Sequence, residues 1–220
     1  MATKEIELAY LCRVTEPKGY EQANATEIHE QWEFRLPPGE NGERRGRVRV
    51  RKTTQNGETC YAETIKPPIS EGGHGDHEET IVITEAYFET WKHVFGVTGQ
   101  AKIRYSYLSQ ELKVTVEGQP LTLPPVTFEV DVFLNTAGQR SQYVKVDIEV
   151  QDVIAHLETH YPGIKASQFK IDFSQLPLGI THVIDMGSQD AQDKEAISHF
   201  FETFKLTLSP PEAPFTPTAQ

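Results

Sequence analysis

Arginine occupies every second position from Arg47 to Arg51, with a valine at each position between. Successive side chains of a strand point to opposite faces, so this run predicts three guanidinium groups on one face of a sheet. Like charges in a row repel one another unless an anion neutralises them. Because guanidinium groups form bidentate hydrogen bonds with phosphate, the run is a candidate phosphate site.

The same alternation of charged or polar residues with apolar ones recurs in five further stretches. They are Glu5-Ile6-Glu7, Thr64-Ile65-Lys66, Lys102-Ile103-Arg104, Glu129-Val130-Asp131 and Lys145-Val146-Asp147-Ile148-Glu149. Any one of them would suit the solvated face of a β-sandwich. Six together, some basic and some acidic, favour one sheet surface that holds a multiply charged ligand. A closed barrel with these faces turned inward could carry both kinds of cluster.

The acidic stretches are candidate metal sites, because neighbouring carboxylates repel one another and Mg²⁺ or Mn²⁺ prefers oxygen ligands. The metal candidates are Glu5, Glu7, Asp147 and Glu149, with Asp131 preferred to Glu129 as a further ligand. The phosphate candidates are Arg47, Arg49, Arg51, Lys66, Lys102 and Arg104. Of these, Arg51 is nearest the following turn and is expected to be the most exposed. Arg44 and Arg45 are expected in a loop.

The elements that must position these residues are mostly strands joined by short turns, which predicts a largely antiparallel sheet. Strands are expected at 4–14, 32–36, 47–51, 58–66, 101–109, 111–117, 126–135 and 141–150. The Gln55-Asn56-Gly57 sequence predicts a hairpin turn. Helices are expected at about 85–95, with Thr84 as N-cap, from Asp152 to about 161, and at about 189–205.

Composition limits the class of protein. The chain has 220 residues, 37% hydrophobic content and a net charge of −11, and its mean hydropathy is −0.48. No apolar run approaches the roughly 18 residues that cross a bilayer, and no signal peptide is evident, so we expect a cytoplasmic protein without membrane contact. The acidic balance argues against double-stranded nucleic acid as a partner, but it leaves room for a small polyanion in an enclosed basic site.

The six charged stretches occur in the order found in the CYTH domain, and the chain resembles this triphosphate tunnel metalloenzyme superfamily over about residues 4–185. The resemblance implies an α+β, β-dominated fold: a tunnel of eight antiparallel strands, closed as a barrel, with flanking helices. It also implies a bound triphosphate, such as inorganic triphosphate or ATP, together with Mg²⁺ or Mn²⁺. Carried onto this chain, it implies catalytic roles for Glu5, Glu7, Lys66 and Arg104.

One position departs from the family pattern. The opening motif of the family is Glu-x-Glu-x-Lys, and Ala9 stands where the lysine is expected. We therefore expect a metal-dependent triphosphatase, with two alternatives: a module that binds nucleotide or polyphosphate with little turnover, and an adenylate cyclase of the class IV kind.

The domain plan follows from the same reading. One domain is expected over 1–207, followed by a Pro-rich tail at 208–220. The aromatic side of the last helix is expected to pack inside the protein, and a homodimer formed through it is an open alternative. His156 and His160 have the i, i+4 spacing of some zinc sites, but surface histidines are the preferred interpretation.

Overall fold

The structure is a computed structural model that describes residues 7–37, 46–66, 79–95, 98–109, 111–116, 118–150 and 169–206. Its strands are β1 (Glu7–Val14), β2 (Ala25–Arg35), β3 (Arg47–Gln55), β4 (Glu58–Lys66), β5 (Glu79–Val82), β6 (Thr98–Leu108), β7 (Leu112–Val116), β8 (Gln119–Leu123), β9 (Thr127–Leu134), β10 (Arg140–Glu149), β11 (Phe169–Ile171) and β12 (Ile180–Asp185). Its helices are α1 (Glu85–Phe95) and α3 (Ala191–Thr203), with the short 3-10 helices η1 (Pro17–Gln22) and η3 (Phe173–Gln175).

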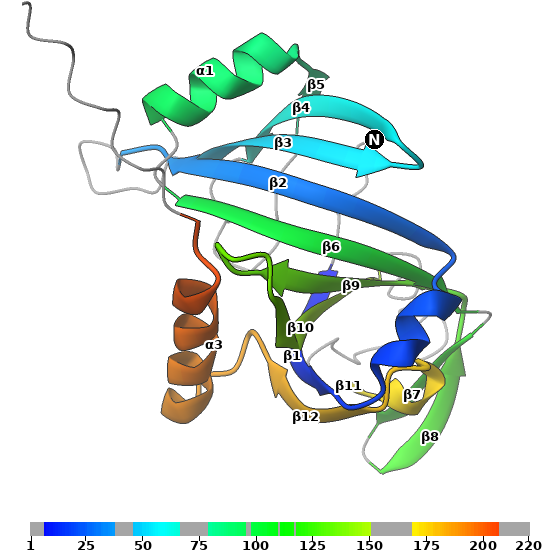
Figure 1. The fold of residues 1–220 in the computed structure, drawn as a ribbon. Helices are drawn as coiled ribbons and strands as arrows, with labels where there is room; N and C mark the ends of the chain where they lie inside the picture. Colours follow the sequence, from blue (N-terminus) through cyan, green and yellow to red (C-terminus); the bar gives the residue numbers. More distant parts are fainter. Residues whose placement is uncertain are drawn as a thin grey trace, which may run out of the picture.

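Nine strands form one antiparallel sheet in the order β12-β1-β10-β9-β6-β2-β3-β4-β5, and β11-β7-β8 form a second, smaller sheet. Figure 1 shows the large sheet as a bent wall that runs from β5 beside α1, through β2 and β6, to β12. The predicted β-dominated, antiparallel fold is confirmed. The large sheet has nine strands instead of eight, and pairing among the described residues does not join β12 to β5. Closure into a barrel therefore stays a prediction.

Local sequence signals explain several boundaries. Asn56 and Gly57 both have positive φ, at 52° and 83°, as the turn between β3 and β4 requires. The backbone N–H of Tyr87 donates to the Thr84 hydroxyl at 3.1 Å, which confirms Thr84 as the cap of α1. The predicted strands at 58–66 and 141–150 and the helices at 85–95 and 189–205 are confirmed within two residues.

The strand expected at 32–36 was placed too short, because β2 begins at Ala25. In the first half of β2, one face carries polar side chains and the other face carries both polar and apolar ones. The sequence there lacks the regular alternation of apolar residues that predicts a strand. The helix expected after Asp152, the two histidines at 156 and 160, Arg44, Arg45 and the Pro-rich tail lie outside the described residues.

Three apolar clusters support the sheet. The largest packs the valines of β9 and β10 against β7, β8 and η3. A second lies beneath α1, where Trp32 and Val50 meet Phe88 and Trp91. A third places Phe200 of α3 against Leu11 and Phe133. In the described part of the chain, no helix is long and apolar enough to cross a membrane.

Candidate functional site

The strand register brings the charged stretches onto one face of the large sheet. Residues opposite one another on neighbouring strands project to the same face, as do residues two apart on one strand. Arg104 is opposite Asp131, and Asp131 is opposite Lys145. Lys102 is opposite His29 on β2. Through β2 the same face continues to the arginine strand, where Arg51 is opposite Gln31.

This surface is called the charged face below. Its described basic residues are Arg13, Arg35, Arg47, Arg49, Arg51, Lys66, Lys102, Arg104 and Lys145, and its described acidic residues are Glu27, Glu33, Glu129, Asp131 and Asp147. The other face of the same strands carries the valines and aromatic residues of the core.

Asp131 is the centre of a buried ion-pair network. Its carboxylate accepts hydrogen bonds from the Lys102 ammonium and from Nε and Nη2 of Arg104, at 2.8 and 2.9 Å. Asp131 is 0% exposed and Lys102 is 5% exposed. Burial alone would raise the pKa of Asp131, but the charges of Lys102 and Arg104 outweigh it and hold this pKa well below its usual value. Asp131 is therefore ionised at neutral pH, and it fixes two basic side chains.

Arg104 connects Asp131 to the other carboxylates of β9 and β10. Its guanidinium also pairs with Glu129 and lies 3.8 Å from Oδ2 of Asp147. Burial alone would lower the pKa of Arg104, but the surrounding carboxylates raise it. Lys145 donates to Oδ2 of Asp147 at 2.5 Å. Two cations therefore meet buried carboxylates at the centre of the charged face.

The arginine strand lies beside this centre. Arg47 contacts Glu33 at 3.4 Å and has a side chain that is 41% exposed. Arg51 was expected to be the most exposed of the three arginines, and this expectation is wrong. Its Nε atom is buried and has no hydrogen-bond partner among the described residues. The physical reason is that β3 continues to Gln55, so Arg51 occupies the middle of the strand and not its end.

Burial, followed by the charge of Arg104, lowers the pKa of Arg51. Burial also lowers the pKa of Lys102 to about 8, although Asp131 acts in the opposite direction. Burial is the largest cause of both shifts, so a bound anion would favour the charged forms of Arg51 and Lys102.

The predicted metal ligands are described unevenly. Glu5 lies outside the described residues, and for Glu7 and Glu149 the structure describes the backbone, which places them opposite each other in the register. Asp147 is 2% exposed and precedes Glu149 by two residues on the same strand. Asp131 has both oxygens bound by basic side chains. Among the described side chains no group of three His, Cys, Asp or Glu is arranged around a metal position.

The donor set nevertheless suits a hard divalent cation. Asp147 supplies carboxylate oxygens, and the backbone places Glu7 and Glu149 at adjacent register positions. Mg²⁺ and Mn²⁺ keep several waters, so two or three carboxylates are enough. Ala9 lies opposite Asp147 in this register. The metal roles of these residues and of Asp131 stay predictions.

Sequence reasoning assigned no role to His29, which lies within the charged face. It is 1% exposed, and its Nε2 lies 2.7 Å from Oε2 of Glu27. Burial, together with the charges of Arg51, Lys102 and Arg104, lowers its pKa to about 3. The imidazole is therefore neutral at pH 7, and donation from Nε2 to Glu27 leaves Nδ1 as an acceptor. The signal that could have found it is the alternation of Glu27, His29 and Gln31 along β2.

Lys145 was recognised within an alternating stretch but was given no function. Its position opposite Leu11 and its bond to Asp147 place its ammonium close to the register position of Ala9. Lys66 lies farther out, opposite Arg47 near the start of β3. The structure thus brings Lys102, Arg104, Asp131 and Asp147 into direct contact and places Arg47 and Lys66 toward one end of the face.

Comparison with known proteins gives matches among solved structures. No family model matches the chain, and no curated protein matches it. The PH1819 protein from Pyrococcus horikoshii is 19% identical, with 75% of this chain and 93% of that chain covered and a TM-score of 0.42. The inorganic triphosphatase NE1496 is 17% identical, with 90% and 96% covered and a TM-score of 0.40.

A third match is HpAC1 from Hippeastrum, for which a dominant triphosphatase activity is described. It is 12% identical, with 74% of this chain and 93% of that chain covered and a TM-score of 0.30. With TM-scores below 0.5, these matches carry no argument about the activity of this chain.

Proposed function

We propose that the charged face binds a triphosphate compound together with Mg²⁺ or Mn²⁺ and that the protein hydrolyses it. The observation that carries this proposal is the buried ion-pair network of Lys102, Arg104 and Asp131, placed on the same face as the arginine strand. Burying charges is costly unless they are paired or serve a ligand. Burial lowers the pKa of Arg51, and a bound anion would stabilise its charged form.

A compact polyphosphate suits this surface better than a nucleic acid. The chain has a net charge of −11, so a long phosphate backbone would be repelled outside the basic area. The three arginines at alternate positions of β3 are close to one another, because a strand rises about 3.3 Å per residue. Their spacing fits a few linked phosphoryl groups.

Each part of the face has a defined task in the proposed reaction. Arg47, Arg49 and Arg51 bind phosphate oxygens through their guanidinium groups. Lys102 and Arg104 are held by Asp131 and stabilise charge that develops on the phosphoryl group. Lys66 binds phosphate at the outer end. Asp147, with the predicted ligands Glu5, Glu7 and Glu149, would hold the divalent cation, which neutralises phosphate charge and lowers the pKa of a bound water.

A second function remains open because of Ala9, which removes the lysine of the family motif. The alternative is a protein that binds triphosphate or nucleotide with little turnover. Lys145 favours the hydrolase over this alternative, because its ammonium group bonds to Asp147. Asp147 is the residue opposite Ala9, so an ammonium is present near the position where the motif lysine is missing. A cyclase would instead release pyrophosphate from ATP while a ribose hydroxyl attacks.

The test is phosphate release from inorganic triphosphate and from ATP, with Mg²⁺ or Mn²⁺, while cyclic nucleotide is measured in parallel. A hydrolase should release phosphate, and Glu7→Ala should abolish that release. Glu202→Ala is the matched control, because this glutamate is 70% exposed on α3. If the protein binds triphosphate tightly but releases no more phosphate than Glu7→Ala, the hydrolase proposal is rejected and the binding function is supported.

A further inference from the structure

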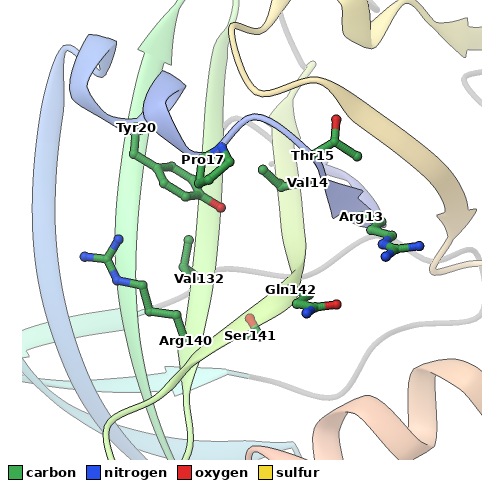
Figure 2. A pocket seen from close by; sticks show the side chains of 9 residues that line it. All are labelled: Arg13, Val14, Thr15, Pro17, Tyr20, Val132, Arg140, Ser141 and Gln142. Atoms are coloured by element: carbon green, nitrogen blue, oxygen red, sulfur yellow. The ribbon is translucent and has the colours of Figure 1, made fainter.

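A cavity of about 480 Å³ lies where the ends of β1 and β9 and the start of β10 meet the segment leading into η1. Its lining includes Arg13, Val14, Tyr20, Val132, Arg140 and Gln142 (Figure 2). The volume is typical of pockets that take small molecules. Of these residues only Arg13 projects to the charged face, because it lies two residues after Leu11 on β1. The others lie outside that face, so the cavity is a separate feature of the molecule.

One wall of the cavity is apolar and rigid. Val132 lies beneath it in the main core and is 0% exposed, so the accessible apolar surface comes from Val14, Pro17 and Tyr20. The ring of Tyr20 stacks on Tyr105, with ring centres 4.6 Å apart and planes inclined by 22°. A stacked ring is held in place, so it presents a fixed surface to an occupant of the cavity.

The rim is cationic. Figure 2 shows Arg140 below the Tyr20 ring on one side of the cavity and Arg13 on the other side, with the Arg13 side chain pointing away from the remaining labelled side chains. Both arginines are exposed, and neither forms an ion pair with a carboxylate in the described part of the chain. Burial raises the pKa of the Tyr20 phenol to about 12, and the phenol is therefore a hydrogen-bond donor at neutral pH.

Two hydroxyl groups of the lining are already committed. The Thr15 hydroxyl donates to the carbonyl of Gly179 at 2.7 Å, and the Ser141 hydroxyl donates to the carbonyl of Tyr143 at 2.5 Å. Inorganic phosphate would therefore find few donors beyond the rim, whereas the apolar wall of Val14, Pro17 and Tyr20 would stay uncovered. An anion with an apolar body uses both parts of the cavity.

We propose that this cavity binds a small organic acid, whose anionic group pairs with Arg140 and whose apolar body lies on Val14 and the Tyr20 ring. The proposal does not depend on the function of the charged face, because it uses other residues and another class of ligand.

The test uses benzoate as the probe, followed by amide chemical shifts in two-dimensional NMR of the full chain. Acetate has the charge without the apolar body, and benzyl alcohol has the ring without the charge. Benzoate should move the amides of Val14, Ser141 and Gln142 with a low-millimolar dissociation constant. Acetate and benzyl alcohol should each bind about ten-fold more weakly, because each loses one of the two contributions.

Arg140→Ala should weaken benzoate binding about ten-fold, through loss of a charge-assisted hydrogen bond. Arg35→Ala is the matched control, since its side chain is 85% exposed and lies outside the cavity. An unchanged melting temperature for Arg140→Ala would show that the fold is intact. The proposal is overturned if acetate binds as tightly as benzoate, if the shifted amides lie elsewhere, or if Arg140→Ala binds benzoate like the wild type.

Discussion

Replacing Asp131 by Asn removes the one negative charge that both Lys102 and Arg104 contact. The substitution keeps the size of the side chain and one oxygen acceptor. It also places an NH₂ group beside the Lys102 ammonium and the Arg104 guanidinium, which are donors and cannot accept a hydrogen bond from it. Two cations are left beside a neutral amide at a position that is 0% exposed.

The expected cost follows from this burial. Removing one partner of a buried ion pair destabilises a protein by about 3–5 kcal/mol, chiefly because the remaining charge is buried and uncompensated. Arg104 still has Glu129 as a partner, so most of the cost falls on Lys102. For a chain of this size the loss corresponds to a melting temperature lower by roughly 6–20 °C.

The assay is urea unfolding followed by circular dichroism, with the free energy obtained by linear extrapolation. Glu202→Gln is the control, because it removes an ion pair with Lys205 whose carboxylate is 70% exposed, and such pairs contribute at most about 1 kcal/mol. Adding Lys102→Met to Asp131→Asn should recover part of the loss, since it removes the stranded ammonium.

A loss for Asp131→Asn below about 1 kcal/mol, equal to that of the control, would refute the reasoning. It would mean that water or a counter-ion reaches the network and that these charges are not buried in solution.

Three further predictions concern other parts of the structure. The pKa of His29 is lowered to about 3 in the folded protein, whereas the pKa of an unfolded histidine is about 6.5. Between these two pH values unfolding takes up a proton, so the free energy of unfolding falls as the pH falls from about 6.5 toward 3. His29→Gln should therefore reduce the slope of unfolding free energy against pH by about 1 kcal/mol per pH unit between pH 4 and 6, and an unchanged slope would contradict it. Gly99→Ala should cost about 1–3 kcal/mol in urea unfolding, because the new Cβ would lie 2.6 Å from the Trp32 ring; a neutral effect would show that the ring shifts freely. Lys145→Ala should weaken tripolyphosphate binding in calorimetry about ten-fold, and Ala9→Lys in that variant should restore part of it, since the new ammonium lies opposite Asp147; no loss in the first variant would remove Lys145 from the site.

Much of the site could be predicted because residues two apart on a strand project to the same face of the sheet. Alternation alone placed Lys102 and Arg104 on one face and Asp131 and Lys145 on matching faces of their own strands. The register that joins these faces depends on long-range pairing, which no local pattern specifies. The contact between Arg104 and Asp131, 27 residues apart, could therefore be proposed from the sequence but not located.

The parts that were missed share a physical cause. His29 lies in the first half of β2, where regular alternation of apolar residues is absent, so the predicted strand at 32–36 was too short. Burial of Arg51 depends on how far β3 and its neighbours extend, and a nearby turn gives no information about this. Short edge strands such as β12 are stabilised by pairing with β1 and carry little signal of their own.

The central claim is that the charged face binds a triphosphate. Isothermal titration calorimetry with tripolyphosphate and Mg²⁺ tests it most directly, with Arg49→Ala compared with Lys113→Ala. Arg49 lies on the charged face beside Arg51, whereas Lys113 lies on β7 of the second sheet and has a side chain that is 53% exposed. We expect micromolar binding by the wild type and by Lys113→Ala, and binding at least about ten-fold weaker by Arg49→Ala. Equal affinity for Arg49→Ala and the wild type, or no binding by any of the three proteins, would contradict the claim.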